Sequence, residues 1–252
     1  MTIFYFTSTG NSLAVAKAIG GKLISIPQVM DAPQRHYKDD VIGVVFPVYG
    51  LLPAKIVQDF LDKVKFEAEY TFAIGTYGNM PGGCMRKVQK QAEKNGCRFD
   101  YANDILMLDN FLPVFEMGAE MEKLPRKKAQ ENLAKIVEDI HSRKHRTAEA
   151  SIGGKILTAM GPLMSPNSKG AQKYLVNDRC NQCGTCAKVC PTKNIAVADK
   201  VIFSDCCAGC LACLHHCPQN AIHLKNEKSA IRWRNPDVSL GEIISANSRT
   251  NL

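Results

Sequence analysis

Eight of the eleven cysteines in this chain of 252 residues stand in two runs with the same spacing. Each run reads Cys-x-x-Cys-x-x-Cys-x-x-x-Cys-Pro, and the offset of 27 residues between the runs also maps Ile195 onto Ile222. Three thiolates with two residues between neighbours let a tight loop hold three corners of an iron–sulfur cube. The spacing therefore predicts [4Fe–4S] clusters. The cysteines are Cys180, Cys183, Cys186 and Cys190 in the first run, and Cys207, Cys210, Cys213 and Cys217 in the second.

Zinc sites and disulfide frameworks are the alternatives for a cysteine-rich segment. Paired Cys-x-x-Cys zinc sites lack the third cysteine at this spacing and the proline after the fourth, here Pro191 and Pro218. Residues 175–226 resemble the bacterial ferredoxins that carry two [4Fe–4S] clusters. The resemblance implies that the fourth cysteine of each run binds the cluster of the other run. The first cluster would then take Cys180, Cys183, Cys186 and Cys217, and the second Cys207, Cys210, Cys213 and Cys190.

A second group of residues suited to chemistry lies near the N-terminus, between an expected first strand and an expected first helix. The loop Thr7-Ser8-Thr9-Gly10-Asn11-Ser12 offers hydroxyls and backbone N–H groups at a helix start, where the helix dipole favours a phosphate dianion. We expect Asn11 and Ser12 to cap this helix. The loop resembles the flavodoxin phosphate loop, and this resemblance implies bound FMN. An ordinary capped turn is the alternative.

The same resemblance implies where the flavin ring would lie. In flavodoxin-like folds FMN binds at the carboxyl ends of the strands, so the loops after the third and fourth strands should contact the ring. Each loop offers one tyrosine, Tyr49 or Tyr77, which either stacks on the ring or packs half-buried against the protein. Asn110 is a weaker candidate, and Asp109 is the nearest carboxylate in loops that are less acidic than those of flavodoxins. The predicted ring contacts are Pro47, Val48, Tyr49, Gly50, Thr76, Tyr77, Gly78, Asn79, Gly82 and Gly83.

The first 146 residues alternate short apolar strands with helices. We expect strands over residues 2–6, 23–26, 41–47, 70–76 and 105–108, and helices over residues 11–19, 53–65, 84–95 and 125–146. Apolar strands between helices are typical of a parallel sheet that is covered on both faces. The sequence therefore predicts an α/β fold. It consists of a flavodoxin-like, doubly wound, five-stranded parallel sheet of order 2-1-3-4-5, followed by a small α+β bacterial ferredoxin domain.

These patterns divide the chain into four parts. They are residues 1–146, an FMN-binding domain; 147–173, a linker; 174–226, the ferredoxin domain; and 227–252, a tail. The linker contains an apolar run, residues 156–164, which we expect to pack between the two domains. The tail holds the single tryptophan, Trp233, and a short helix is expected near residues 240–245.

Composition and charge bear on partners and cellular location. The formal net charge is +8, but two clusters with their thiolate ligands contribute about −4, so part of the basic excess balances the cofactors. We expect no nucleic-acid partner, because no basic stripe is interleaved with aromatic residues. Glycines and prolines interrupt the longest apolar stretch, residues 41–57, so no membrane span is expected. The free thiols and the absence of a signal-peptide pattern predict a cytoplasmic protein. Cys84, Cys97 and Cys206 are left without an assigned role.

The two parts together resemble the flavodoxin–ferredoxin fusion proteins of anaerobic microbes. This resemblance implies an electron carrier that passes electrons between two [4Fe–4S] clusters and FMN, and on to redox partner proteins. FMN exchanges one or two electrons and each cluster exchanges one, so a chain with both can split or collect electron pairs. The first alternative is an FMN-dependent reductase of a small acceptor, for which we name no catalytic residue. The second is a nucleotide-binding module without FMN.

Overall fold

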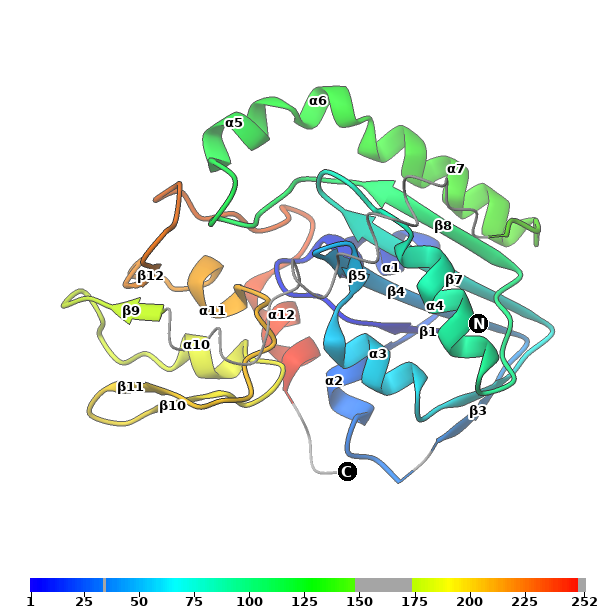
Figure 1. Cartoon of the computed structure of the whole chain (residues 1–252), viewed down its shortest axis with the longest axis horizontal. Helices are drawn as coiled ribbons and strands as arrows, with labels where there is room; N and C mark the ends of the chain where they lie inside the picture. The colour runs from blue at the N-terminus through cyan, green and yellow to red at the C-terminus, as the bar shows by residue number, and fades with distance from the viewer. Residues whose placement is uncertain (34, 148–173, 249–252) are drawn as a thin grey trace.

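The computed structural model describes residues 1–33, 35–147 and 174–248. Within these residues the largest sheet has five parallel strands in the order β2-β1-β4-β7-β8, which is 2-1-3-4-5 along the chain (Figure 1). The predicted flavodoxin-like α/β fold is therefore confirmed. The strands are β1 (Thr2–Tyr5), β2 (Lys22–Ser25), β4 (Val41–Tyr49), β7 (Tyr70–Tyr77) and β8 (Tyr101–Leu106), with β5 (Leu52–Pro53) paired antiparallel to the end of β4.

The central strands β4 and β7 are apolar because both faces of the sheet are covered. They are buried over nearly their whole length. Gly43 of β4 pairs with Phe72 of β7, and a Cβ atom at Gly43 would lie 2.0 Å from the Phe72 ring. The ring thus fills the space that a side chain at position 43 would need, which favours this register.

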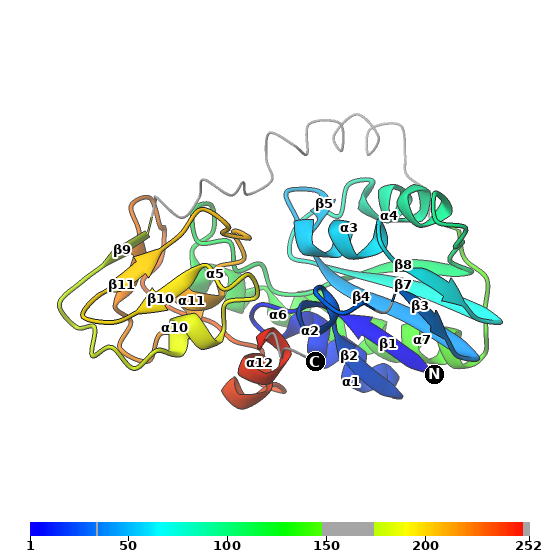
Figure 2. The ribbon, with the colours of Figure 1, turned by 90° about the horizontal axis from the view of Figure 1, so that it is seen from below.

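Helices cover the sheet on both faces (Figure 2). One face packs against α1 (Asn11–Ile19) and α7 (Ala129–His141), through residues such as Val15 and Ile136. The other packs against α3 (Lys55–Leu61) and α4 (Cys84–Glu93), through residues such as Phe60 and Val88. The carboxyl ends of the strands form one edge of the sheet, which points toward the cysteine-rich part of the chain (Figure 2).

Several element boundaries differ from those expected. Pro53 belongs to β5, so the helix expected from residue 53 begins at Lys55. The last strand begins at Tyr101 rather than residue 105. The helix expected over residues 125–146 is broken at Lys128, whose φ is 48°. Its pieces are α6 (Leu124–Lys127) and α7, preceded by α5 (Met117–Glu122); an unexpected parallel pair joins β3 (His36–Lys38) to β6 (Lys65–Glu67).

The cysteine-rich part folds into a small α+β unit with an internal repeat. Two short antiparallel pairs flank two single helical turns (Figure 1). Ile195 begins one strand and Ile222 begins the equivalent strand, so the sequence repeat is also a structural repeat. The elements are β9 (Tyr174–Val176) paired with β12 (Ile222–Leu224), β10 (Ile195–Val197) paired with β11 (Val201–Phe203), and the turns α10 (Thr185–Lys188) and α11 (Ala212–His215).

The tail returns from this unit to the parallel sheet. Its helix α12 (Leu240–Asn247) confirms the helix expected near residues 240–245 and begins with a capping box between Ser239 and Glu242. Val238 and Ile243 are buried in the same core as α1 and β1. The linker prediction falls on residues 148–173, which lie outside the described residues. Of the helices that are described, none has the length and apolar character needed to cross a membrane.

Candidate functional site

The two cysteine runs fold around two small neighbouring cavities, and each cavity takes cysteines from both runs. One cavity is lined by Cys180, Cys183, Cys186 and Cys217, and the other by Cys207, Cys210, Cys213 and Cys190. The fourth cysteine of each run therefore lies with the first three of the other run. Cys186 lies in the single helical turn α10 and Cys190 follows two residues after its end, so the two cavities must be close together.

Backbone N–H groups point at the sulfur atoms in both cavities. Asn194 N donates to Cys190 Sγ at 3.2 Å, and Ala221 N donates to Cys217 Sγ at 3.3 Å. These two bonds are equivalent under the 27-residue repeat. A third bond runs from Gly209 N to Cys207 Sγ at 3.3 Å. Such bonds stabilise thiolate ligands and tune the reduction potential of an iron–sulfur cluster.

Thiolates in the second cavity would need a positively charged partner, because the cavity is buried. Burial holds the pKa of the Cys213 thiol well above its usual value, and the nearby Cys210 and Cys190 thiols raise it further. Four thiolates in this space require a cationic core, which the iron of a [4Fe–4S] cluster would supply. The donor set therefore fits the cluster that the spacing predicts.

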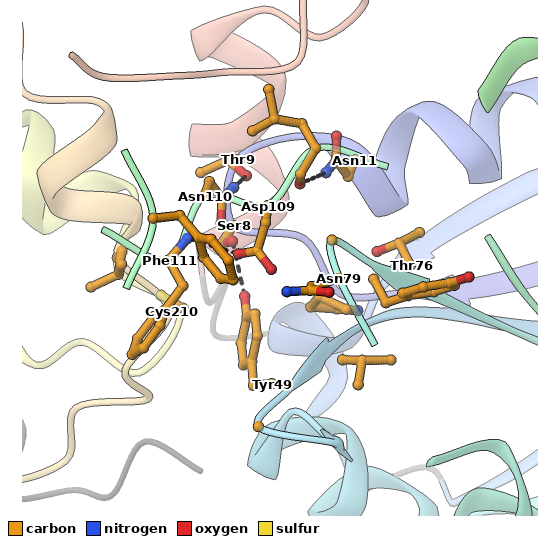
Figure 3. Close-up of a pocket in the computed structure, with 18 of the residues that line it drawn as sticks. Ser8, Thr9, Asn11, Tyr49, Thr76, Asn79, Asp109, Asn110, Phe111 and Cys210 are labelled. Carbon is orange, nitrogen blue, oxygen red and sulfur yellow. Dashed lines mark hydrogen bonds between the residues drawn. The ribbon is translucent and has the colours of Figure 1, made fainter. Parts of the chain in front are cut away.

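A larger cavity of about 450 Å³ opens at the carboxyl ends of the parallel strands (Figure 3). Loops that follow β1, β4, β7 and β8 form most of its wall, and the segment 209–211 of the second cysteine run completes it. Its volume is that of a typical cofactor site. Its lining residues are Thr7, Ser8, Thr9, Asn11, Ser12, Pro47, Val48, Tyr49, Gly50, Leu51, Thr76, Tyr77, Gly78, Asn79, Met80, Leu108, Asp109, Asn110, Phe111, Val114, Phe115, Gly209, Cys210 and Leu211.

Hydrogen bonds tie the hydroxyls of the first loop to the neighbouring loops. Tyr49 Oη donates to Ser8 Oγ at 2.9 Å, and Asn110 Nδ2 donates to Thr9 Oγ1 (Figure 3). The Ser12 and Thr76 hydroxyls are 2.9 Å apart and form a third bond. Three polar groups of the loop are thus held in fixed positions by side chains from β4, β7 and the segment after β8.

The start of α1 differs from the expected cap. Asn11 and Ser12 were expected to cap the helix, but Gly10 takes the N-cap position with φ of 106°, and no side chain within the described residues caps that end. Gly10 N instead donates to Thr7 Oγ1 at 3.1 Å, and the Asn11 amide donates to Leu108 O at 3.3 Å. The first-turn N–H groups of α1 are therefore left without a capping side chain, as an anion site requires.

Most of the predicted cofactor residues lie in the wall of this cavity. The exceptions are Gly10, Gly82 and Gly83, which do not line it; Gly83 is the N-cap residue of α4. Sequence reasoning missed the aromatic residues Phe111 and Phe115, which follow β8. Their position directly after the fifth parallel strand could have predicted that they lie near the cavity. The segment 209–211 carried no such signal, because only the fold brings it to the flavodoxin-like half.

The loops after β7 and β8 approach each other closely beside the cavity. A Cβ atom at Gly78 would lie 2.3 Å from Asp109 Cβ and 2.4 Å from Asp109 Cα. Asp109 accepts a hydrogen bond from Phe111 N at 3.0 Å, and burial raises the pKa of its carboxyl group. Asp109 is thus a partly buried carboxyl group in the cavity wall that more readily keeps its proton.

A buried lysine forms hydrogen bonds with both of these loops. Lys127 Nζ donates to Gly78 O and to Met107 O, each at 2.8 Å, and pairs with Glu120 at 3.1 Å. Lys127 and Glu120 are 8% and 3% exposed. A buried charge without a partner would lower the stability of the fold, so the Lys127–Glu120 pair is expected to persist. Through this pair, α5 and α6 hold the cavity loops in place.

The three remaining cysteines have different surroundings. Cys84 and Cys97 are buried, and burial raises the pKa of both thiols, to about 12 for Cys97. Buried thiols of this kind are unreactive. Cys206 is exposed, and its thiol contacts Thr192 O at 3.4 Å.

Comparison with known proteins supports an iron–sulfur site. Residues 173–196 match the family model of the 4Fe-4S binding domain, a span that contains the first cysteine run. Similar solved structures include a protein from Bacteroides uniformis described as a flavoprotein, with 16% identity over 42% of this chain and 89% of that chain and a TM-score of 0.33. They also include two-electron reduced flavodoxin from Megasphaera elsdenii, with 21% identity over 41% of this chain and 83% of that chain and a TM-score of 0.32. No curated protein matches the sequence. At these scores the fold assignment rests on the strand order alone.

The close approach at Gly78 generates a prediction. Replacing Gly78 by Ala forces apart the loops after β7 and β8, because the contacts include the Asp109 backbone. Overpacking of this kind lowers the free energy of unfolding by about 1–3 kcal/mol, measurable by chemical denaturation. Gly241→Ala is the matched control, because its Cβ atom would be 3.9 Å from its nearest contact, Ser239 Oγ. Equal stability of Gly78→Ala and wild type would contradict the close contact.

Proposed function

We propose that this protein transfers electrons between two [4Fe–4S] clusters and one FMN, and exchanges them with redox partner proteins. The observation that carries the proposal is the position of Cys210. It lines both the large cavity and the small cavity of Cys190, Cys207 and Cys213. A cluster ligand would then form part of the wall around the flavin. Electrons could pass between the two cofactors without crossing a solvent layer.

The proposal orders the two clusters. The cluster held by Cys190, Cys207, Cys210 and Cys213 is the inner one, next to the flavin. The other set contains Cys183, which is exposed, and therefore forms the outer cluster, nearest a partner protein. Electrons would enter or leave at the Cys183 side and reach the flavin through the inner cluster.

Residues around the cavity supply the features that FMN needs. The first-turn N–H groups of α1 and the hydroxyls of Thr7, Ser8, Thr9 and Ser12 would hold the phosphate; of the residues that the structure describes, no lysine or arginine lines this site. Tyr49, Tyr77 and Asn79 would lie beside the ring. When bound, FMN supplies both one-electron and two-electron chemistry. The protein's part is to exclude water and fix the distance to Cys210.

A reductase of a small acceptor is the second candidate function. Asp109 favours it, because its carboxyl group lines the cavity and burial raises its pKa, so that it could deliver a proton. The acceptor would gain two electrons through the flavin and two protons, one from Asp109 and one from water. Met80 and Val114, both exposed and both in the cavity wall, would then contact the acceptor.

Anaerobic electron-transfer measurements separate these functions. Purified protein should contain one FMN and about eight irons per chain. If the protein is an electron carrier, adding reduced ferredoxin should bleach the flavin absorbance in proportion to the electrons added. Small acceptors should not be turned over. Cys206→Ser is a matched control that should transfer electrons normally, because Cys206 lines neither cysteine cavity. Stoichiometric zinc, or iron near four per chain, would contradict the two clusters. Sustained turnover lost in Asp109→Asn would favour the reductase.

The phosphate loop can be tested by charge. Thr9→Asp places a carboxylate where the phosphate dianion would lie, so repulsion and lost hydrogen bonds should weaken FMN binding by at least about 1.5–3 kcal/mol. Fluorescence titration measures the affinity. Thr147→Asp is the control for the added negative charge, because Thr147 is exposed and does not line the large cavity. FMN bound by Thr9→Asp with unchanged affinity would refute this loop as the phosphate site.

Crosswise ligation predicts which cluster each cysteine supports. Cys190→Ser should damage the cluster of Cys207, Cys210 and Cys213, although Cys190 belongs to the first run. Cys217→Ser should damage the cluster of the first run instead. Electron paramagnetic resonance of the reduced protein should show spin coupling between two clusters in wild type, and a simpler spectrum in either variant. The crosswise assignment would be contradicted if Cys190→Ser lost the cluster of Cys180, Cys183 and Cys186 instead, or if Cys217→Ser lost the cluster of Cys207, Cys210 and Cys213.

A further inference from the structure

Three consecutive backbone carbonyl groups of the N-terminal loop accept hydrogen bonds from the last third of the chain. Thr7 O accepts from Asn247 Nδ2 at 3.3 Å. Ser8 O lies 2.9 Å from His216 Nε2, and Thr9 O accepts from Asn235 N at 2.8 Å. The donors come from three separate places: the second cysteine run, the segment before α12 and the last residue of α12.

The burial of the loop explains why these bonds matter. Thr7, Ser8 and Thr9 are 2%, 5% and 2% exposed, so their carbonyl groups need protein donors in place of water. A loop that offers N–H groups to an anion on one side turns its carbonyl groups to the other side. On that other side lie residues 216, 235 and 247.

The tail also fits against the turn of the loop. Asn235 Nδ2 donates to Asn11 Oδ1 at 3.1 Å. A Cβ atom at Gly10 would lie 2.8 Å from Asn235 Cβ and 3.0 Å from Val238 Cβ. Gly10 therefore combines a positive φ with the close approach of a segment that is 225 residues away in sequence. The tail therefore packs on one side of the loop, and the other side of the loop faces the large cavity.

His216 joins this arrangement to the cysteine cavities. It stands between Cys213 and Cys217, which line different small cavities, and is 5% exposed. Ser8 O can only accept, so Nε2 of His216 carries the proton in this bond. A displacement of the second cysteine run would therefore pull on the loop at Ser8.

We propose that His216, Asn235 and Asn247 are positioning residues for the phosphate loop, and that they link FMN binding to the folded iron–sulfur half. This inference rests on the proposed function, because it assigns the loop to the FMN phosphate. The linkage is reciprocal: a folded cluster unit raises the affinity for FMN, and bound FMN stabilises the cluster unit by the same factor. The two cofactors are then loaded as one cooperative unit.

The first test uses Asn247, because it is far from the cysteines in sequence. Asn247→Leu leaves Thr7 O without its donor, and FMN affinity of the full-length, cluster-loaded protein should fall at least about tenfold. Ser248→Ala is the control, because the bond that the Ser248 hydroxyl makes to the described residues is to Ser245 O, near the end of α12. Iron content should equal that of wild type in both. Amide hydrogen exchange in residues 7–12 should rise in Asn247→Leu, with or without FMN.

A pair of variants at His216 keeps the inference falsifiable if Asn247→Leu fails to fold. His216→Phe removes the donor to Ser8 O, whereas His216→Gln places an amide N–H near the same position and should recover most of the affinity. Equal FMN affinity and equal amide exchange in wild type, Asn247→Leu and His216→Phe would overturn the positioning role and leave the proposed function intact. A wild-type protein that bound no FMN would overturn the proposed function, and this inference with it.

Discussion

The contact between the carboxyl edge of the parallel sheet and the second cysteine run is the constraint on which the rest of the structure depends. That edge ends in loops whose carbonyl groups are buried, and two adjacent histidines supply donors to them. His215 Nε2 lies 2.9 Å from Asn110 O, and His216 Nε2 lies 2.9 Å from Ser8 O. Both bonds form at the place where Cys210 enters the large cavity. Removing the cysteine-rich half would therefore expose the cavity and leave Ser8 O and Asn110 O without these donors.

The two copies of the cysteine run differ at the positions where the second copy makes this contact. At equivalent positions the first copy has Gln182 and Lys188, both exposed, and the second has Gly209 and His215, which face the flavodoxin-like half. Leu211 replaces a glycine of the first copy, yet it keeps the left-handed conformation, with φ of 59°. Leucine is strained there, and its burial at 5% exposure offsets the strain by packing against the cavity wall. The sequence differences between the copies thus distinguish the run that contacts the flavodoxin-like half from the run that does not line the large cavity.

Short-range patterns predicted the alternation of strands and helices, and the resemblance to flavodoxins implied the sheet order that the structure has. The ends of the strands and helices, and the cap of α1, were predicted less well. Pro53 satisfies the rules for a helical first turn, but pairing with Val48 places it in β5. Asn11 is a good cap by type, but its side chain bonds Leu108 O and Asn235, contacts that exist only in the folded chain. The tail could not be assigned for the same reason: its contacts with Thr7 and Thr9 span more than 220 residues.

The protonation of the two histidines follows from their partners and is consistent with a permanent contact. Trp233 N donates to His215 Nδ1 at 3.2 Å, so the proton of the neutral ring is on Nε2, where Asn110 O accepts it. Burial lowers the pKa of His215 to about 4 and also lowers that of His216. Both rings are therefore neutral donors at neutral pH, and their bonds to the cavity loops depend on tautomer rather than on charge. These two bonds therefore add no charge between the large cavity and the cysteine cavities. The two histidine bonds thus join the cysteine-rich half to the cavity loops without depending on an ion pair.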